Sequence, residues 1–215
     1  MKLNKFILTS IIFIFIVLIF CFIKEKINFI STNINKTKNL ENMIDIMSTN
    51  EKFRDFKTIY SKLNEKEKVN LYKYMKNDSS RVLPIYYIAV SDDILKKNKD
   101  EALLFYTIGI LRSKLDVFMC EDETNIEQII FYPSIAPKVS DYYKEIDTVN
   151  LAKIYKEFLN WDDKHPQHPN SVWICYHGIT VFEGEKPSIK SDEEYLKLKK
   201  DMRISLQKMI YENLN

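Results

Sequence analysis

The chain has 215 residues, of which 46% are apolar and 29% are charged, and it contains only three Gly and six Pro. This composition is typical of a globular protein, and the long stretches without Gly or Pro favour helices over many short strands. The net charge is +2, but residues 1–30 contribute +3, so residues 31–215 carry a net charge of −1. Because positive and negative residues are interleaved there and Arg is scarce, we expect no nucleic-acid binding.

The first 30 residues have the pattern of a membrane anchor. Phe6–Ile23 contains 18 residues without a charge, enough for a helix of about 27 Å, close to the thickness of a hydrocarbon core. Two lysines precede this run, as in a secretory signal, but no small residue follows it to permit cleavage. Lipidation of Cys21 requires a small residue before it, and Phe20 occupies that position. We therefore predict an uncleaved transmembrane span over residues 6–23.

The charges that flank this run predict the orientation of the chain. The net positive charge before the run exceeds that after it, which favours a cytoplasmic amino terminus. We expect a single-pass protein of the inner (cytoplasmic) membrane whose body faces the periplasm. Residues 1–30 then form the anchor, the polar residues 31–50 form a linker, and residues 51–215 form a helical soluble domain.

Helix signals recur through this body. Asn64 with Glu67 three residues later predicts a helix start within residues 63–77. Residues 81–120 predict two helices joined by a turn at 98–100. The second helix of this pair is apolar nearly all round, which indicates that it is buried on most sides.

The helical hairpin carries a family resemblance. "KDEALLFYTIG", which opens its second helix, resembles a single degenerate tetratricopeptide or Sel1-type unit, in which small residues such as Ala102 or Gly109 lie where the helices cross. The longer string "EALLFYTIGILRSKLDVFMCED" also resembles a group of small exported bacterial proteins of unknown function. The resemblance covers residues 81–122 without a second copy. It implies a helical hairpin and implies no activity.

Two further helices are predicted near the carboxyl end. Residues 147–161 place apolar side chains on one stripe behind an Asp147 cap, and residues 191–215 do the same behind a capping box formed by Ser191 and Glu194. Between them, "VWICY" and "ITVF" are compatible with either a small strand hairpin or one helix. The predicted fold class is mainly α.

The stretch "HPQHPNSVWICYH" holds all three histidines of the chain. Zinc and related ions bind converging His, Cys or carboxylate ligands, so the candidate metal ligands are His165, His168, Cys175 and His177. The first two histidines each precede a proline, which favours an extended backbone, and no established metal-binding spacing is present. We interpret the stretch as a loop between helices, and we keep a small metal-dependent envelope hydrolase as the alternative. The acids at 120–123 and 161–163 are interpreted as solvated helix ends.

No nucleophile motif or phosphate-binding loop occurs, so we assign no catalytic residue and no cofactor. An exported body tends to oxidise its cysteines, which predicts a disulfide between Cys120 and Cys175. We expect a non-catalytic helical module that binds a protein partner, in envelope assembly or in immunity to a toxin. Because Tyr and Trp dominate the energetics of protein interfaces, the candidate binding residues are Tyr86, Tyr87, Tyr106 and Trp173. Membership of the core is the more common role for each of these side chains.

Overall fold

The computed structural model describes residues 53–77, 82–166 and 173–214, all of which belong to one compact unit, Ile44–Asn215. These residues form helices joined by short loops, together with one isolated antiparallel bridge between Cys120 and Ile189. The mainly α prediction is confirmed for this part of the chain. The predicted span 6–23 lies outside it, and no helix within it is long and apolar enough to cross a membrane.

Helices α2 (Phe53–Tyr60) and α3 (Glu65–Asn77) open the described chain. The predicted capping box before α3 is present, because the Glu67 amide donates to Asn64 Oδ1 at 3.0 Å and the Asn64 amide donates to Glu67 Oε2 at 2.9 Å. These two bonds satisfy backbone donors that would otherwise have no partner at the helix start.

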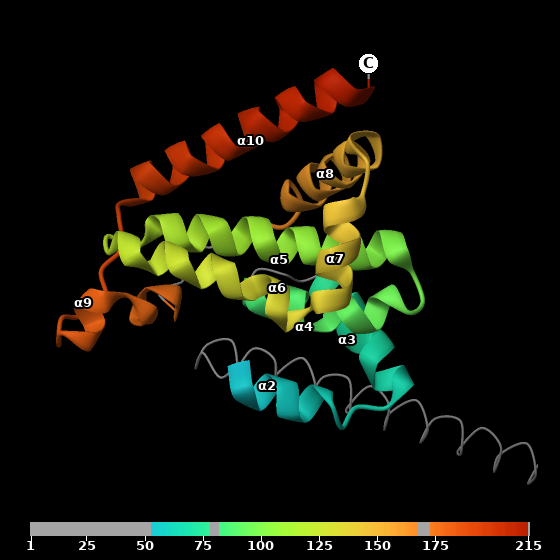
Figure 1. Ribbon diagram of the computed structural model, residues 1–215, viewed down its shortest axis with the longest axis horizontal. Helices are drawn as coiled ribbons and strands as arrows, with labels where there is room; N and C mark the ends of the chain where they lie inside the picture. Colours follow the sequence, from blue (N-terminus) through green and yellow to red (C-terminus); the bar gives the residue numbers. More distant parts are fainter. Residues whose placement is uncertain (1–52, 78–81, 167–172, 215) are drawn as a thin grey trace, which may run out of the picture. The chain divides into compact units, whose positions relative to one another are not determined.

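The predicted hairpin forms the centre of the domain (Figure 1), with α4 (Pro84–Leu95) packed against α5 (Lys99–Met119). Asn98 caps α5 by accepting from the Glu101 amide at 3.1 Å. Gly109 lies at the helix crossing, where an added Cβ would be 2.9 Å from the Pro84 carbonyl oxygen. A glycine at this position lets the two backbones approach closely.

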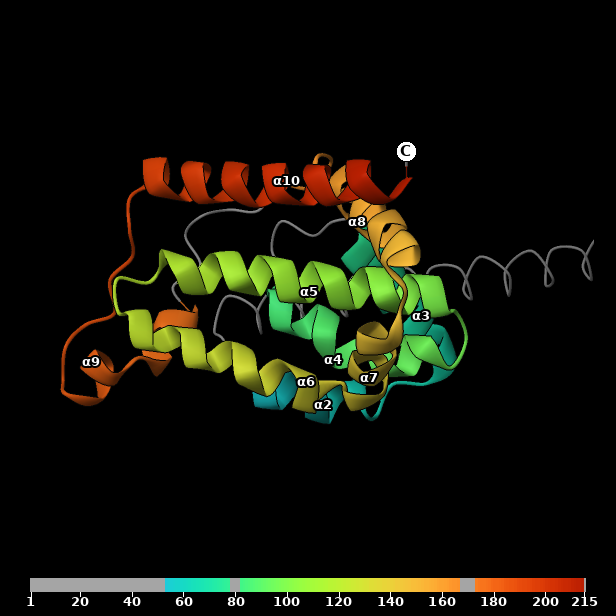
Figure 2. The same ribbon diagram turned by 45° about the horizontal axis from the view of Figure 1, so that its top comes forward.

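The later elements surround α5 (Figures 1 and 2). They are η2 (Glu123–Phe131), α6 (Tyr132–Ile135), α7 (Pro137–Glu145), α8 (Thr148–Asp162), η3 (Trp173–His177), α9 (Ile179–Phe182) and α10 (Asp192–Leu214). The predicted caps are present, because Asp147 accepts from the Asn150 amide at 2.8 Å and Ser191 exchanges hydrogen bonds with Glu194. The apolar stripes of α8 and α10 face inward, and Tyr195 of α10 packs with Leu115 and Met119 of α5.

Residues 173–182 form two short helical turns, which is neither of the two arrangements considered from the sequence. Gly178 separates the turns with an extended backbone (φ −77°, ψ 159°). A Cβ at this position would overlap the side chains of Asp122 and Asn125. The break between the turns therefore coincides with a close approach of the chain to the start of η2.

Candidate functional site

The aromatic residues of the hairpin do not form an exposed groove. Tyr86 and Tyr87 are 0% exposed and Tyr106 is 3% exposed, so these three candidate binding residues lie in the core of the described domain. Tyr86 stacks on Phe56 of α2 with ring centroids 4.2 Å apart. The Tyr87 hydroxyl donates to the Met75 carbonyl oxygen at 2.5 Å. The side chain of the fourth candidate, Trp173, is not among those that the structure describes.

Three of the four candidate metal ligands lie in the described part of the chain, and none of these three belongs to a group of potential ligands there. Cys175 is joined to Cys120 by a disulfide bond, the pairing expected from the sequence, and its sulfur is no longer a thiolate that could bind zinc. The ring of His165 stacks on Trp161, and its two nitrogens lie 2.8 Å and 3.1 Å from backbone carbonyl oxygens. His177 is exposed, and His168 lies outside the described residues. No group of three or more potential ligands occurs within the described ranges.

The disulfide brings two distant segments together, and we refer to residues 118–131 and 173–190 as the disulfide end. The Cα atoms of Cys120 and Cys175 are 5.4 Å apart, although 55 positions separate them in the chain. A second connection lies beside this bond, where the Lys190 amide donates to the Met119 carbonyl at 2.8 Å and the Glu121 amide donates to the Ser188 carbonyl at 3.2 Å.

Asp122 makes a third connection across the disulfide end. One carboxylate oxygen accepts from the Thr124 amide at 2.9 Å and from its hydroxyl at 2.6 Å. The other oxygen accepts from the Thr180 amide at 2.9 Å and from its hydroxyl at 3.0 Å. These bonds, led by the one from the Thr124 hydroxyl, lower the pKa of Asp122 to about 2. The ionised carboxylate thus links the start of η2 to α9.

This cross-linked region exposes large apolar side chains. Phe182 is 83% exposed, Ile130 is 73% exposed and Phe131 is 60% exposed. The other exposed apolar side chains of the disulfide end are Phe118, Ile126, Tyr176 and Ile179. A single exposed apolar residue is common, but seven of the twelve large exposed apolar side chains among the described residues belong to these two segments, whose elements η2 and η3 contact each other. Such a concentration is typical of a binding surface. The disulfide end is therefore the candidate functional site.

A recess lies within the disulfide end. It has a volume of about 350 Å³ and is lined by Val117, Phe118, Cys120, Glu123, Ile126 and Lys190. The lining is mostly apolar, with one acid and one base, and the Lys190 ammonium group already donates to the Phe118 carbonyl at 2.9 Å. A recess of this composition suits an apolar side chain.

A buried ionic cluster lies on another side of α5. Arg112 is 1% exposed, and its guanidinium group donates to Asp162 Oδ1 at 2.8 Å and stacks over Trp161 at 4.4 Å from the ring centre. Lys199 and Arg203 of α10 each approach Asp162 Oδ2 at 3.1 Å. The cluster connects α5, α8 and α10. Arg203 also lines a hollow of about 320 Å³ between α8 and α10, but Arg112 and Asp162 do not line it and are buried, so we assign the cluster to the stability of the fold.

The burial of Asp162 corrects the interpretation of residues 161–163 as a solvated helix end. Burial alone would raise the pKa of this carboxyl group, but the charges of Arg112 and Lys199 outweigh that effect and lower the pKa overall. One sequence signal could have indicated the cluster. The chain has only four Arg, and two of them contact Asp162, which is consistent with the preference for Arg in buried carboxylate pairs.

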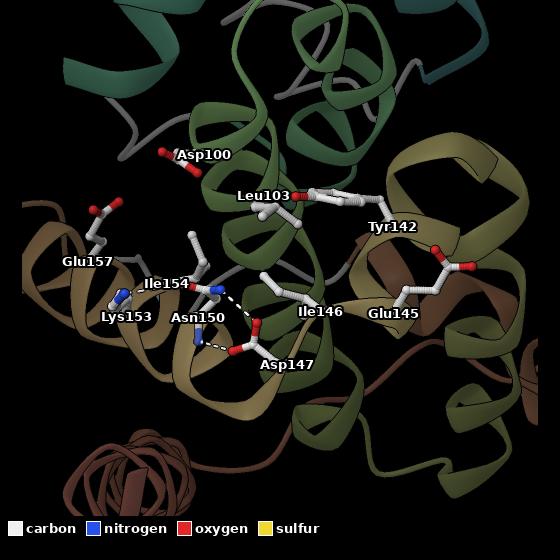
Figure 3. A pocket seen from close by; sticks show the side chains of 10 residues that line it. All are labelled: Asp100, Leu103, Tyr142, Glu145, Ile146, Asp147, Asn150, Lys153, Ile154 and Glu157. Carbon is white, nitrogen blue, oxygen red and sulfur yellow. Dashed lines mark hydrogen bonds between the residues drawn. The ribbon is translucent and has the colours of Figure 1, made fainter. Parts of the chain in front are cut away.

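A hollow lies between the start of α5, the end of α7 and α8, and Figure 3 shows the side chains that line it. Its volume is about 400 Å³. Leu103 and Ile154 contribute to its floor, and the exposed acids Asp100, Glu145 and Glu157 surround it. Asp147 also lines the hollow, but its carboxylate is occupied by the cap of α8. No buried polar group points into the hollow as a ligand site would require, so we interpret it as a solvated helix junction.

The class of protein that these features define is an all-helical domain with a disulfide-braced, apolar surface. Comparisons of the chain with protein-family models, with curated proteins and with solved structures give no match.

Proposed function

We propose that the chain is a membrane-anchored helical module that binds a protein partner through the disulfide end, without catalysis. The observation that supports this most strongly is the cluster of exposed apolar side chains in that region. Leaving such side chains in water is unfavourable, and a partner that covers them would recover about 25 cal/mol per Å² of apolar surface.

The rigidity of the disulfide end also supports a binding role. η2 has nine residues in 3-10 geometry and α9 has only four residues; elements of these kinds have little intrinsic stability. The disulfide and the Asp122 hydrogen bonds hold them to the end of α5. Fixing a loop-rich surface before binding reduces the entropy lost when a partner binds.

The proposed location is the outer side of the inner membrane, with residues 6–23 as the span and the body facing the periplasm. A disulfide between the two cysteines of the body is typical of proteins in oxidising compartments. The resemblance of residues 81–122 to tetratricopeptide and Sel1-type units is consistent with a protein partner. Envelope assembly and immunity to a toxin are the two forms of this role that we propose.

Paired variants test the binding role. Ile130→Ser with Phe182→Ser should leave the free energy of unfolding nearly unchanged and abolish recovery of the partner after detergent extraction. Ile204→Ser with Tyr211→Ser removes two exposed apolar side chains from α10 and should preserve recovery. Equal recovery with both pairs would contradict the proposed function.

A topology experiment tests the location independently. A phosphatase fused after Asn50 should be active and a fluorescent protein fused there should be dark, because the expected orientation places this position in the periplasm. The opposite pattern would place the body in the cytoplasm.

A further inference from the structure

We propose that the disulfide end binds a basic amphipathic segment of its partner, one in which apolar anchor residues are flanked by Lys or Arg. This inference rests on the proposed function and adds the chemistry of the partner. The short elements of the disulfide end carry both exposed apolar side chains and negative charge. A complementary segment of the partner must therefore supply apolar side chains and positive charge.

The charge of the disulfide end is strongly negative. Residues 118–131 and 173–190 contain six acids and two lysines, a net charge of −4, whereas the other residues of the body 51–215 carry a net charge of +3. Glu121 and Asp122 are engaged by Ser188, Thr124 and Thr180. Among the described residues, no hydrogen bond or ion pair engages the carboxylates of four exposed acids of this region, which are Glu123, Glu127, Glu183 and Glu185.

One of these acids lines a recess together with exposed apolar side chains, and two others are next to exposed apolar residues in the sequence. Glu127 adjoins Ile126 in η2, and Glu183 follows Phe182 at the end of α9. Glu123 lines the same recess as Ile126 and Phe118. An apolar anchor placed in this recess would therefore lie near the Glu123 carboxylate, with which a neighbouring Lys or Arg of the partner could form an ion pair. Lys190 also lines the recess, and its ammonium group donates to the Phe118 carbonyl.

Two other occupants fit less well. An anionic membrane surface would be repelled by the net negative charge of the disulfide end, since such surfaces attract Lys and Arg. A second copy of the chain would bring the same acids against themselves, and like charges across an interface disfavour association. A basic partner segment is the occupant that satisfies both the apolar and the charged groups.

The test uses the full chain in zwitterionic detergent and two labelled amphipathic peptides. The first peptide contains Leu, Phe and Lys, and the second has the same apolar residues with every Lys replaced by Glu. Fluorescence anisotropy should give binding of the basic peptide that is at least about tenfold tighter, and this binding should weaken as salt screens the charges. Equal binding of the two peptides would overturn the inference.

Variants of the chain then locate the site. Replacing the four acids with Gln should weaken binding of the basic peptide about tenfold, as expected for the loss of several exposed ion pairs. The matched control replaces the three exposed acids of the hollow in Figure 3 (Asp100→Asn, Glu145→Gln, Glu157→Gln) and should bind as the unmodified chain does. Unchanged binding by the first variant, or binding of the disulfide end to phosphatidylglycerol vesicles in place of the peptide, would overturn the inference.

Failure of this inference differs from failure of the proposed function. The serine variants of Ile130 and Phe182 change no charge. If they abolish partner recovery while the peptides bind regardless of charge, the partner contacts the disulfide end but is not basic. If they leave partner recovery unchanged, the binding role itself is wrong.

Discussion

Loss of the disulfide should destabilise the domain by a predictable amount. The bond between Cys120 and Cys175 closes a loop with a sequence separation of 55. In the chain-entropy model, opening a loop of this length costs about 4 kcal/mol at 25 °C, because the unfolded chain regains the freedom that the bond removes. With a urea dependence of about 2 kcal/mol/M, the unfolding midpoint should fall by about 2 M.

Urea unfolding of the full chain in detergent, followed by tryptophan fluorescence, measures this shift. The double variant Cys120→Ser, Cys175→Ser should match the reduced protein, and Cys21→Ser should match the oxidised protein. A midpoint change below about 0.5 M would refute the reasoning. It would mean that other contacts already restrict the two segments in the unfolded chain, or that the bond does not form.

Three further predictions concern packing and charge. Gly109→Ala should lower the Tm, because the new Cβ would lie too close to the Pro84 carbonyl oxygen. This loss should outweigh the preference of about 1 kcal/mol that Ala ordinarily has over Gly in a helix. An unchanged Tm would contradict the close approach of α4 and α5 at this position. Asp162→Asn should reduce the free energy of unfolding by about 3 kcal/mol, because it removes the buried carboxylate that Arg112 contacts. The same substitution at the exposed neighbour, Asp163→Asn, should lower the free energy of unfolding by less than about 1 kcal/mol. Equal losses in the two variants would contradict the claim that the buried ion pair between Arg112 and Asp162 stabilises the fold. Folding lowers the pKa of Asp162, so the stabilisation that its carboxylate gives is present above the pKa of the unfolded chain and is lost as the pH falls toward the pKa of the folded protein. When the free energy of unfolding is measured against pH in the acid range, the Asp162→Asn variant should lack this part of the pH dependence.

Local rules predicted much of the fold. The caps at Asn64, Asp147 and Ser191 depend on residues three positions apart, so the sequence alone identifies them. The resemblance to tetratricopeptide and Sel1-type units implied a small residue, Ala102 or Gly109, at the helix crossing, and Gly109 lies at a close approach to α4. The pairing of Cys120 and Cys175 follows from the small number of cysteines in the body.

The features that were not predicted depend on contacts between distant segments. Adjacent positions on a helix point in different directions, so Tyr86 and Tyr87 are both buried only because α2 covers one side of α4 and α5 covers another. Asp162 is buried because Arg112, 50 positions earlier, lies opposite it. No rule based on sequence spacing contains this information. The exposed cluster of the disulfide end was missed for the same reason, since an apolar run such as "ITVF" does not indicate what covers it.

Photo-crosslinking in the cells that produce the protein tests the central claim most directly. A photoreactive phenylalanine analogue at Phe182 should crosslink one discrete partner, and the same analogue at Tyr211, another well exposed aromatic position on α10, should not. The Phe182 crosslink should disappear when Ile130→Ser is added to the same chain. Crosslinking from Tyr211 alone, or from neither position, would contradict the proposal that the disulfide end binds the partner.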